Sequence, residues 1–379
     1  MRKIQMVDLQ QQYQQIKPEV EDALKQILDS CAFINGPAVK NFQENMEKYL
    51  KVKHVIPCAN GTDAIQVSLM ALGLNAGDEV ITTTFTFIAT AEVIALLGLT
   101  PVLVDVLPDT FNIDVRAIEQ AITSKTKAII PVHLFGQCAN MEDVMTLAKK
   151  HNLHVIEDNC QAIGADYTFK DGIQQKAGTI GTMGCTSFFP SKNLGCYGDG
   201  GAVFTNDDQL AHQLRGIVNH GMFVRYYHDM VGVNSRLDSI QAAILDIKLK
   251  RLDKYAQKRQ EAAAFYNKAF DDNEHITTPK TASFSNHVFH QYTLVLHRTE
   301  REKVISYMAE KQIPVMIYYP VPLHLQKAYA DTRYRQGAFP VSEHLAANVI
   351  SLPIHTELDE EQLNYITTNL LDAVKLAAK

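Results

Sequence analysis

Residues 128–157 read AIIPVHLFGQCANMEDVMTLAKKHNLHVIE and decide the fold. An apolar run over Ala128–His133 is followed by a helical pattern over Met141–His151 and a second apolar run over Leu153–Glu157. Short runs that are apolar on both faces are typical of strands buried in a mostly parallel sheet. A strand, a helix and a second strand in this order predict a βαβ unit, and therefore an α/β architecture.

The same alternation extends from about residue 54 to residue 205. It predicts a mostly parallel mixed sheet with helices on both faces. The other expected strands are His54–Ala59, Glu79–Thr83, Thr100–Val106, Cys185–Phe189 and Gly201–Thr205, and the other expected helices are Ala64–Leu74, Ala89–Leu97 and Val115–Ala121. We expect this sheet to form the centre of a large domain that comprises residues 1–250.

The remaining residues, 251–379, predict a smaller α+β domain. A helix without Gly or Pro is expected from Asp238 to about Phe270, where it would bridge the two domains. A strand over Phe289–Leu296, a helix over Glu300–Lys311 and a strand over Pro314–Tyr319 should follow. A Pro-rich loop then leads to a last helix from Asp359.

Composition narrows the functional class. The net charge of -6 over 379 residues argues against nucleic acid as the main partner. The six cysteines are dispersed without a C-x-x-C pair, which favours free thiols in a reducing cytoplasm over disulfides or a metal site. The first twenty residues lack the apolar core of a signal peptide. The most apolar stretch, residues 93–106, contains Pro101 and Asp105, so we expect no membrane span.

Two chemically distinctive side chains are expected near the carboxyl edge of the sheet. Asp158 follows the strand that ends at Glu157, and Lys192 lies in the loop Ser187-Phe-Phe-Pro-Ser-Lys192-Asn-Leu-Gly195. Ligands of open α/β sheets bind at that edge. An amine that can form a Schiff base and a carboxylate that can pair with a pyridinium nitrogen are what a pyridoxal phosphate enzyme most needs from its protein. Asp158 as a turn cap and Lys192 as a solvated surface charge remain the alternatives.

A phosphate site is indicated by Asn60-Gly61-Thr62-Asp63, which follows a strand and opens a helix. Free N–H groups and the helix dipole favour an anion there, and the Thr62 hydroxyl adds a donor. Ser187, at the end of a strand, could reach the same phosphate. The alternative is a simple turn in which Thr62 or Asp63 caps the helix.

Several further residues are candidates for ligand contacts. Phe87 could stack on a pyridine ring or belong to the core, and Gln161 could donate to the ring's phenolic oxygen. Asn234 could be a polar ligand or part of a helix cap. The loop that contains Tyr319 and His324 is aromatic and Pro-rich, which suits a sugar or a nucleotide, and His220 and Arg225 could bind an anionic substrate, although Arg225 could equally be a surface charge.

Together these motifs resemble the sugar-nucleotide aminotransferases of the DegT/DnrJ/EryC1/StrS family, which are pyridoxal phosphate enzymes of fold type I. The resemblance rests on segments spread over nearly the whole chain, namely Val7-Asp-Leu, Gly61-Thr-Asp-Ala, Thr86-Phe-Ile-Ala-Thr-Ala, Glu157-Asp-Asn-Cys-Gln-Ala, Ser187 to Ala202, Asn234-Ser-Arg-Leu-Asp-Ser-Ile-Gln-Ala-Ala and the loop at Tyr318. One such match alone would be weak, but their common order makes the resemblance specific.

The resemblance implies a role for each matching residue. Lys192 matches the lysine that holds the cofactor, Asp158 the partner of the pyridine nitrogen, and Gln161 the neighbour of the ring oxygen. Phe87 matches the stacking ring, whereas Gly61, Thr62 and Ser187 match the phosphate cradle. Asn234 matches a residue that reaches the phosphate of the neighbouring subunit, which implies a homodimer with shared active sites. Arg225, Tyr319 and His324 are our candidates for binding the sugar nucleotide.

The resemblance further implies transfer of an amino group from glutamate to a keto-sugar nucleotide. Within the family the motif around Lys192 is most similar to enzymes that aminate a 3-keto UDP-sugar, the 2-acetamido-2-deoxy-3-oxo-glucuronate in particular, for O-antigen and lipopolysaccharide synthesis. Enzymes for dTDP-3-keto and dTDP-4-keto sugars share most of the same residues and form the first alternative.

Functions of a different class are compatible with parts of these motifs. A non-catalytic regulator of this family would be free to lose Lys192 or Asp158, yet both are present. Relatives that act as dehydratases carry His in place of the lysine, so Lys192 disfavours that reaction. An amino-acid aminotransferase stays open, because it would use the same cofactor site. A nucleotide-binding protein without pyridoxal phosphate is disfavoured, because no Walker A or G-x-G-x-x-G run follows a strand.

Overall fold

A computed structural model describes residues 2–330 and 333–378. Its centre is a seven-stranded mixed sheet in which β2, β3, β4, β5 and β8 are parallel and β9 runs antiparallel to β1 and β8. The strand order is β1 (His54–Cys58), β9 (Gly201–Thr205), β8 (Met183–Ser187), β5 (His154–Asp158), β4 (Thr126–Ile130), β2 (Glu79–Thr83) and β3 (Thr100–Val104). The predicted α/β fold with a mostly parallel sheet is confirmed.

Alternating side chains of the strands face two helical layers. Ile156 and its neighbours on one face contact α3 (Gly61–Ala71), α4 (Ala89–Leu96) and α7 (Asp208–Ile217). Val155 and its neighbours on the other face contact α5 (Val115–Ala121) and α6 (Met141–His151). Because both faces are covered, most strand residues are buried, and the middle of each strand is apolar on both faces instead of alternating with polar residues.

The expected elements of the large domain lie close to their predicted positions. Strands β2 and β9 and helices α5 and α6 have the predicted bounds, whereas β8 begins and ends two residues before the predicted Cys185–Phe189. Two helices that the sequence analysis did not anticipate, α1 (Leu9–Ser30) and α2 (Pro37–Leu50), precede the sheet. Helix α2 packs on α8 and β1.

The continuous helix predicted from Asp238 to Phe270 is wrong. It is two helices, α8 (Ser239–Leu249) and α9 (Leu252–Ala269). The backbone N–H of Arg251 donates to Lys248 rather than to Ile247, and the Arg251 guanidinium donates to the Ile247 carbonyl instead. The same guanidinium pairs with Glu19 of α1. A side chain has therefore replaced the backbone donor that a continuous helix needs, without any Gly or Pro.

A small C-terminal sheet consists of β12 (Ile276–Thr277), β13 (Tyr292–Leu296) and β14 (Val349–Leu352). It shares one apolar core with α9, α10 (Arg301–Glu310) and α12 (Glu360–Ala377). The predicted strand over Pro314–Tyr319 is wrong, because only Met316 pairs, with Ser351 of β14. The domain boundary predicted at residue 250 coincides with the break between α8 and α9 and stays a prediction.

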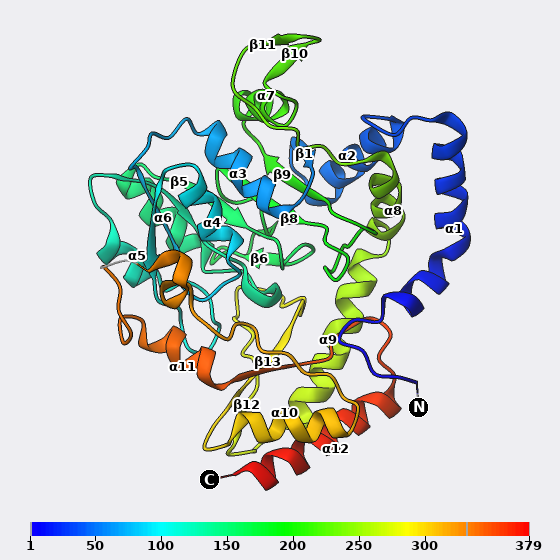
Figure 1. Cartoon of the computed structure of the whole chain (residues 1–379), viewed down its shortest axis with the longest axis vertical. Coiled ribbons are helices and arrows are strands. Elements are labelled where there is room, and N and C mark those ends of the chain that lie inside the picture. The colour runs from blue at the N-terminus through cyan, green and yellow to red at the C-terminus, as the bar shows by residue number, and fades with distance from the viewer. Residues whose placement is uncertain (1, 331–332, 379) are drawn as a thin grey trace.

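One β-hairpin stands away from the rest of the chain. Strands β10 (Met222–Val224) and β11 (Tyr227–His228) project beyond α7 at one end of the molecule, opposite to α10 and α12 (Figure 1). The hairpin was not anticipated from the sequence, and it contains Arg225. Among the described residues, none of the helices has the length and apolar character needed to cross a membrane.

Candidate active site

A cavity of about 730 Å³ opens at the carboxyl edge of the parallel strands. Its wall contains most of the residues that the sequence singled out. These are Gly61, Thr62, Phe87, Asp158, Gln161, Ser187, Lys192 and Tyr319. They come from five separate segments, so their convergence is a result of the fold and not of sequence proximity.

Lys192 offers a free amine to this cavity. Among the residues that the structure describes, no hydrogen bond or ion pair engages its Nζ atom, although its side chain is largely enclosed. Burial lowers the pKa of the Lys192 ammonium, and the nearby Cys160 and Asp158 oppose this shift. A neutral amine is the nucleophile that imine formation requires. The alternative of a solvated surface charge is therefore wrong, since Lys192 faces the cavity.

Asp158 supplies a buried carboxylate to the same cavity, with 5% of its surface exposed. Its Oδ2 atom accepts a hydrogen bond from the Thr90 hydroxyl at 2.8 Å, and its Oδ1 atom accepts one from the Cys160 N–H at 3.2 Å. The second bond is the turn cap that the sequence left open as an alternative. Asp158 thus both caps the turn and lines the cavity.

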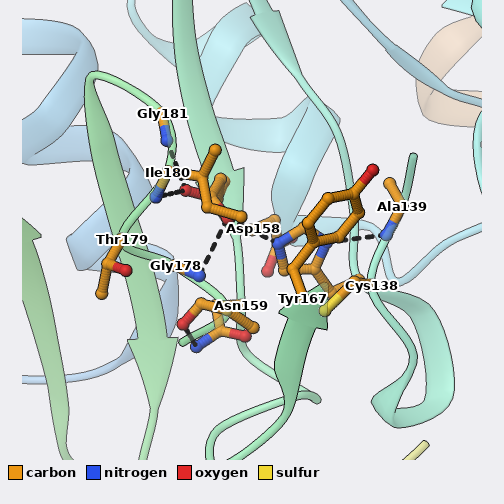
Figure 2. A network of polar contacts seen from close by, with 12 residues as sticks. Cys138, Ala139, Asp158, Asn159, Tyr167, Gly178, Thr179, Ile180 and Gly181 are labelled. Atoms are coloured by element: carbon orange, nitrogen blue, oxygen red, sulfur yellow. Dashed lines mark hydrogen bonds and ion pairs between the residues drawn. The ribbon is translucent and has the colours of Figure 1, made fainter. Parts of the chain in front are cut away.

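The strand end that bears Asp158 is supported by a buried polar network (Figure 2). Glu157, fully buried, accepts hydrogen bonds from the N–H groups of Gly178, Ile180 and Gly181 at 2.8, 2.6 and 2.6 Å. Its fourth donor is His133 Nε2 at 2.8 Å, while His133 Nδ1 accepts from the N–H of Ala139. Because Nδ1 is an acceptor, the ring proton lies on Nε2.

The first turn of α3 forms a cradle for an anion. Asn60 is the N-cap, and its side chain accepts from the N–H of Asp63 at 2.8 Å, so the alternative that Thr62 or Asp63 caps the helix is wrong. Thr62 is left facing the cavity. A Cβ atom at Gly61 would lie 2.6 Å from the Cβ of Ser187 and 2.9 Å from the Cys160 sulfur. Only glycine permits this approach between the helix terminus and β8.

Aromatic side chains close the cavity on the side of the Pro-rich loop. Phe87 keeps 55% of its surface exposed, so it is not a core residue. The Tyr319 hydroxyl accepts from Gln161 Nε2 at 2.9 Å, and Gln161 Oε1 accepts from the N–H of Phe135 at 2.7 Å. Gln161 keeps one further N–H for a ligand. Burial also raises the pKa of Tyr319, so its hydroxyl stays protonated.

Three predicted site residues lie elsewhere. Arg225 is exposed in the β10–β11 hairpin and stacks on the Tyr226 ring at 5.0 Å. Asn234 is exposed, and its backbone forms an isolated antiparallel β-bridge with Asn219. His324 is buried behind the cavity wall, where its Nδ1 lies 2.9 Å from the Thr84 hydroxyl and its Nε2 lies 3.0 Å from Glu343. Their assigned roles stay predictions.

Further residues that the sequence did not single out also line the cavity. Thr90, His290 and Gln291 are among them. Thr90 could have been found, because it lies one helical turn after Phe87 in the motif Thr86-Phe-Ile-Ala-Thr90. His290 and Gln291 carry no comparable signal, since they come from the loop before β13 and approach only in the folded chain.

Comparison with known proteins identifies the family in which this arrangement occurs. The model of the DegT/DnrJ/EryC1/StrS aminotransferase family matches residues 14–371. The chain belongs to this family. A relative from Geobacillus stearothermophilus, named pleiotropic regulatory protein, is 46% identical over 97% of this chain and 98% of its own length. The UDP-2-acetamido-2-deoxy-3-oxo-D-glucuronate aminotransferase of Pseudomonas aeruginosa is 43% identical over 97% of this chain and 99% of its own.

A solved structure of the same family supports the fold in detail. The crystal structure of Streptomyces venezuelae DesV in complex with a ketimine intermediate has a TM-score of 0.94 and 36% identity, and it covers 99% of each chain. The predicted family, fold type and aminotransferase class are confirmed, and pyridoxal phosphate is the family's cofactor. The residues present fit that group: a free amine, a buried carboxylate, an open helix N-terminus and an exposed ring surround one cavity.

Proposed function

We propose that this aminotransferase moves an amino group from glutamate to the keto group of a UDP-3-keto sugar, in the synthesis of a cell-surface polysaccharide such as an O-antigen. The observation that carries the enzymatic part is the meeting of Lys192 and Asp158 in one cavity. The 43% identity to an enzyme named for a UDP-3-oxo-glucuronate derivative supports the sugar. The reaction would then take place in the cytoplasm, where nucleotide sugars are made.

The chain's own residues divide the tasks of the reaction. Pyridoxal phosphate, when bound, supplies a ring that withdraws electrons from the reacting carbon. Asp158 would hold the pyridine nitrogen, Phe87 would cover one face of the ring, and Gln161 would donate to the ring oxygen. Gly61, Thr62 and Ser187 would bind the phosphate through backbone and hydroxyl donors.

Lys192 would hold the cofactor covalently and, once displaced, move protons. Its Nζ atom, whose pKa is lowered by burial, would take the proton from the α-carbon of the amino donor. In the second half-reaction the same atom would donate a proton to the former keto carbon of the sugar, which then carries the new amino group. Such a shuttle contributes roughly 10²–10⁴-fold in rate. Two half-reactions in one cavity predict ping-pong kinetics.

The proposed assembly is a homodimer with shared sites. Arg225 and Asn234 lie outside this chain's cavity, in or next to the projecting hairpin. The hairpin exposes apolar side chains as well, with Val224 63%, Tyr226 76% and Tyr227 70% exposed. A segment of this kind suits insertion against a second copy, where Arg225 would bind a diphosphate or a carboxylate through two oxygens. Tyr319 already faces this cavity and would contact the sugar nucleotide directly, whereas His324, which is buried behind the wall, would support that wall through Thr84 and Glu343.

The test is a two-stage assay of the purified protein loaded with pyridoxal phosphate. Addition of ¹⁵N-glutamate alone should bleach the visible absorption band and release 2-oxoglutarate. UDP-2-acetamido-2-deoxy-3-oxo-glucuronate should then gain one ¹⁵N by mass spectrometry. Transfer to dTDP-3-keto or dTDP-4-keto sugars, with none to the UDP-sugar, would replace the proposed substrate by the first alternative.

The possibility of a regulator is tested by the same assay. A relative named as a regulatory protein shares 46% of its residues with this chain. A chain that binds no pyridoxal phosphate and releases no 2-oxoglutarate with any amino donor would favour a regulatory role. The retention of Lys192, Asp158 and the anion cradle in one cavity supports catalysis.

A further inference from the structure

The Thr90 hydroxyl hydrogen-bonds the Asp158 carboxylate, which the Cys160 thiol also contacts. The hydroxyl lies 2.8 Å from Asp158 Oδ2 and 3.5 Å from the carbonyl oxygen of Phe87. A hydroxyl has a single proton to donate, and the shorter contact to a charged acceptor is the stronger. Only 1% of the surface of Thr90 is exposed, so water does not compete for this bond.

Asp158 has few other partners. Its second oxygen accepts from the Cys160 N–H at 3.2 Å, and no ion pair with a Lys, Arg or His is formed by Asp158 within the described part of the chain. A buried carboxylate without a cation is costly unless its remaining lone pairs are satisfied. The Asp158 carboxylate therefore has a place for a cationic group on the cavity side, and the Thr90 hydroxyl fixes the oxygen that would otherwise rotate.

Thr90 and the Phe87 ring both lie at the start of helix α4. Phe87 lies just before α4, and Thr90 lies in its first turn, three residues later. Both line the cavity together with Asp158. One rigid segment thus determines the position of an exposed aromatic ring and the orientation of a buried carboxylate.

We propose that Thr90 is a positioning residue of this site, which acts on the pyridine nitrogen of the cofactor through Asp158. The inference rests on the proposed role of Asp158. By holding Oδ2, the Thr90 hydroxyl stops rotation of the carboxylate and keeps one lone pair directed at the ring nitrogen. Loss of the hydroxyl should therefore weaken cofactor binding and reduce protonation of the ring nitrogen, even though Thr90 itself need not touch the reacting atoms.

The test compares T90V, T90S and D158N. Valine keeps the shape of threonine without the hydroxyl, and serine keeps the hydroxyl. Each purified variant is stripped of cofactor, titrated with pyridoxal phosphate to obtain a dissociation constant, and scanned for the pH midpoint of its visible band. The ¹⁵N chemical shift of pyridine-labelled cofactor reports the protonation of the ring nitrogen directly.

We expect T90V to bind the cofactor about tenfold more weakly, as for loss of one hydrogen bond to a charged group. Its pH midpoint and ¹⁵N shift should move in the same direction as those of D158N, but by less, and T90S should resemble the unmodified protein. The melting temperature of the cofactor-free protein separates these effects from unfolding, and T90A replaces T90V if valine prevents folding.

Two results would overturn the inference, and they differ in what else they remove. If T90V matches T90S in all three measurements while D158N shifts them, Thr90 merely fills space and the proposed function stands. If D158N also leaves the pH midpoint and the ¹⁵N shift unchanged, Asp158 does not hold the ring nitrogen, and the proposed site fails together with the role of Thr90.

Discussion

The cavity at the sheet edge and the β10–β11 hairpin differ in how the chain supports them. The cavity residues assigned to the cofactor lie at the ends of sheet strands, in the first turn of α3 or in the loops that follow the strands. Asp158 is held from behind by the buried Glu157–His133 pair. The hairpin contacts α7 through Phe223, whose ring stacks on His212 at 4.1 Å, but Tyr226 and Tyr227 are mostly exposed. Most of the proposed cofactor contacts therefore lie in one chain's cavity, whereas the proposed roles of Asn234 and Arg225 require a second copy.

The largest effect is expected from removal of the cavity's amine. K192A should lower turnover by at least about 10²–10⁴-fold, because no other described lysine lines the cavity to move the proton. Turnover is measured by 2-oxoglutarate release under saturating substrates. Since burial of the Lys192 ammonium opposes folding, the melting temperature should be kept or raised. Amination of the keto-sugar by K192A at the unmodified rate would show that Lys192 is not the acting residue.

The hairpin side of the comparison is tested by mixing two inactive variants. In a shared-site dimer, a K192A subunit supplies an intact Asn234 to the site of an N234A subunit, so mixed dimers regain one complete site. After co-expression with different tags and isolation of the mixed species, activity should approach half that of the unmodified dimer. Activity that equals the mean of the two parents, with mixed dimers isolated, would mean that each chain uses its own Asn234.

Parts of the molecule also differ in how far the sequence predicted them. Strand β5 and the positions of Asp158 and Lys192 followed from apolar runs and from the rule that ligands bind at the carboxyl edge. The break at Arg251 did not, because it depends on a side chain that meets the Ile247 carbonyl and Glu19 of α1. His290 enters the cavity from the loop before β13, and such long-range approach leaves no periodic signal.

The buried support behind Asp158 is expected to matter for stability more than for chemistry. In E157Q the amide NH₂ would face N–H groups that now donate to a carboxylate, since all four partners of Glu157 are donors. The loss should be about 3–5 kcal/mol in the free energy of unfolding. Urea denaturation of the cofactor-free protein measures it.

The matched control for this change is E261Q, because Glu261 lies on the surface of α9 and, within residues 2–330 and 333–378, its carboxylate pairs only with Lys258 and Gln257. It should change stability by less than about 1 kcal/mol. Equal stability of E157Q and E261Q would show that the network does not hold the strand end. The sheet edge would then owe its rigidity to apolar packing alone.

The most gradual effect concerns the segment that connects the cavity to the C-terminal sheet, because it builds up over several pH units. Burial lowers the pKa of His287 to about 3. Its Nδ1 atom accepts a hydrogen bond from the N–H of Phe289 at 3.0 Å. Phe289 lies two residues before Gln291, which lines the cavity. The unfolded chain binds a proton below a pKa of about 6.5, whereas the folded chain does not until about 3. The stability contributed by a neutral His287 is therefore present above pH 6.5 and is lost as the pH falls toward 3.

The slope from this one residue is at most about 1.4 kcal/mol per pH unit. H287N can keep the acceptor for Phe289 through its side-chain oxygen, but it does not titrate. Urea denaturation at intervals between pH 7 and 4 should therefore show a shallower decline for H287N, by about one proton, while His355, whose pKa burial lowers to about 4, continues to contribute. An identical pH dependence of the two proteins would mean that His287 is protonated in the folded chain as readily as in the unfolded one.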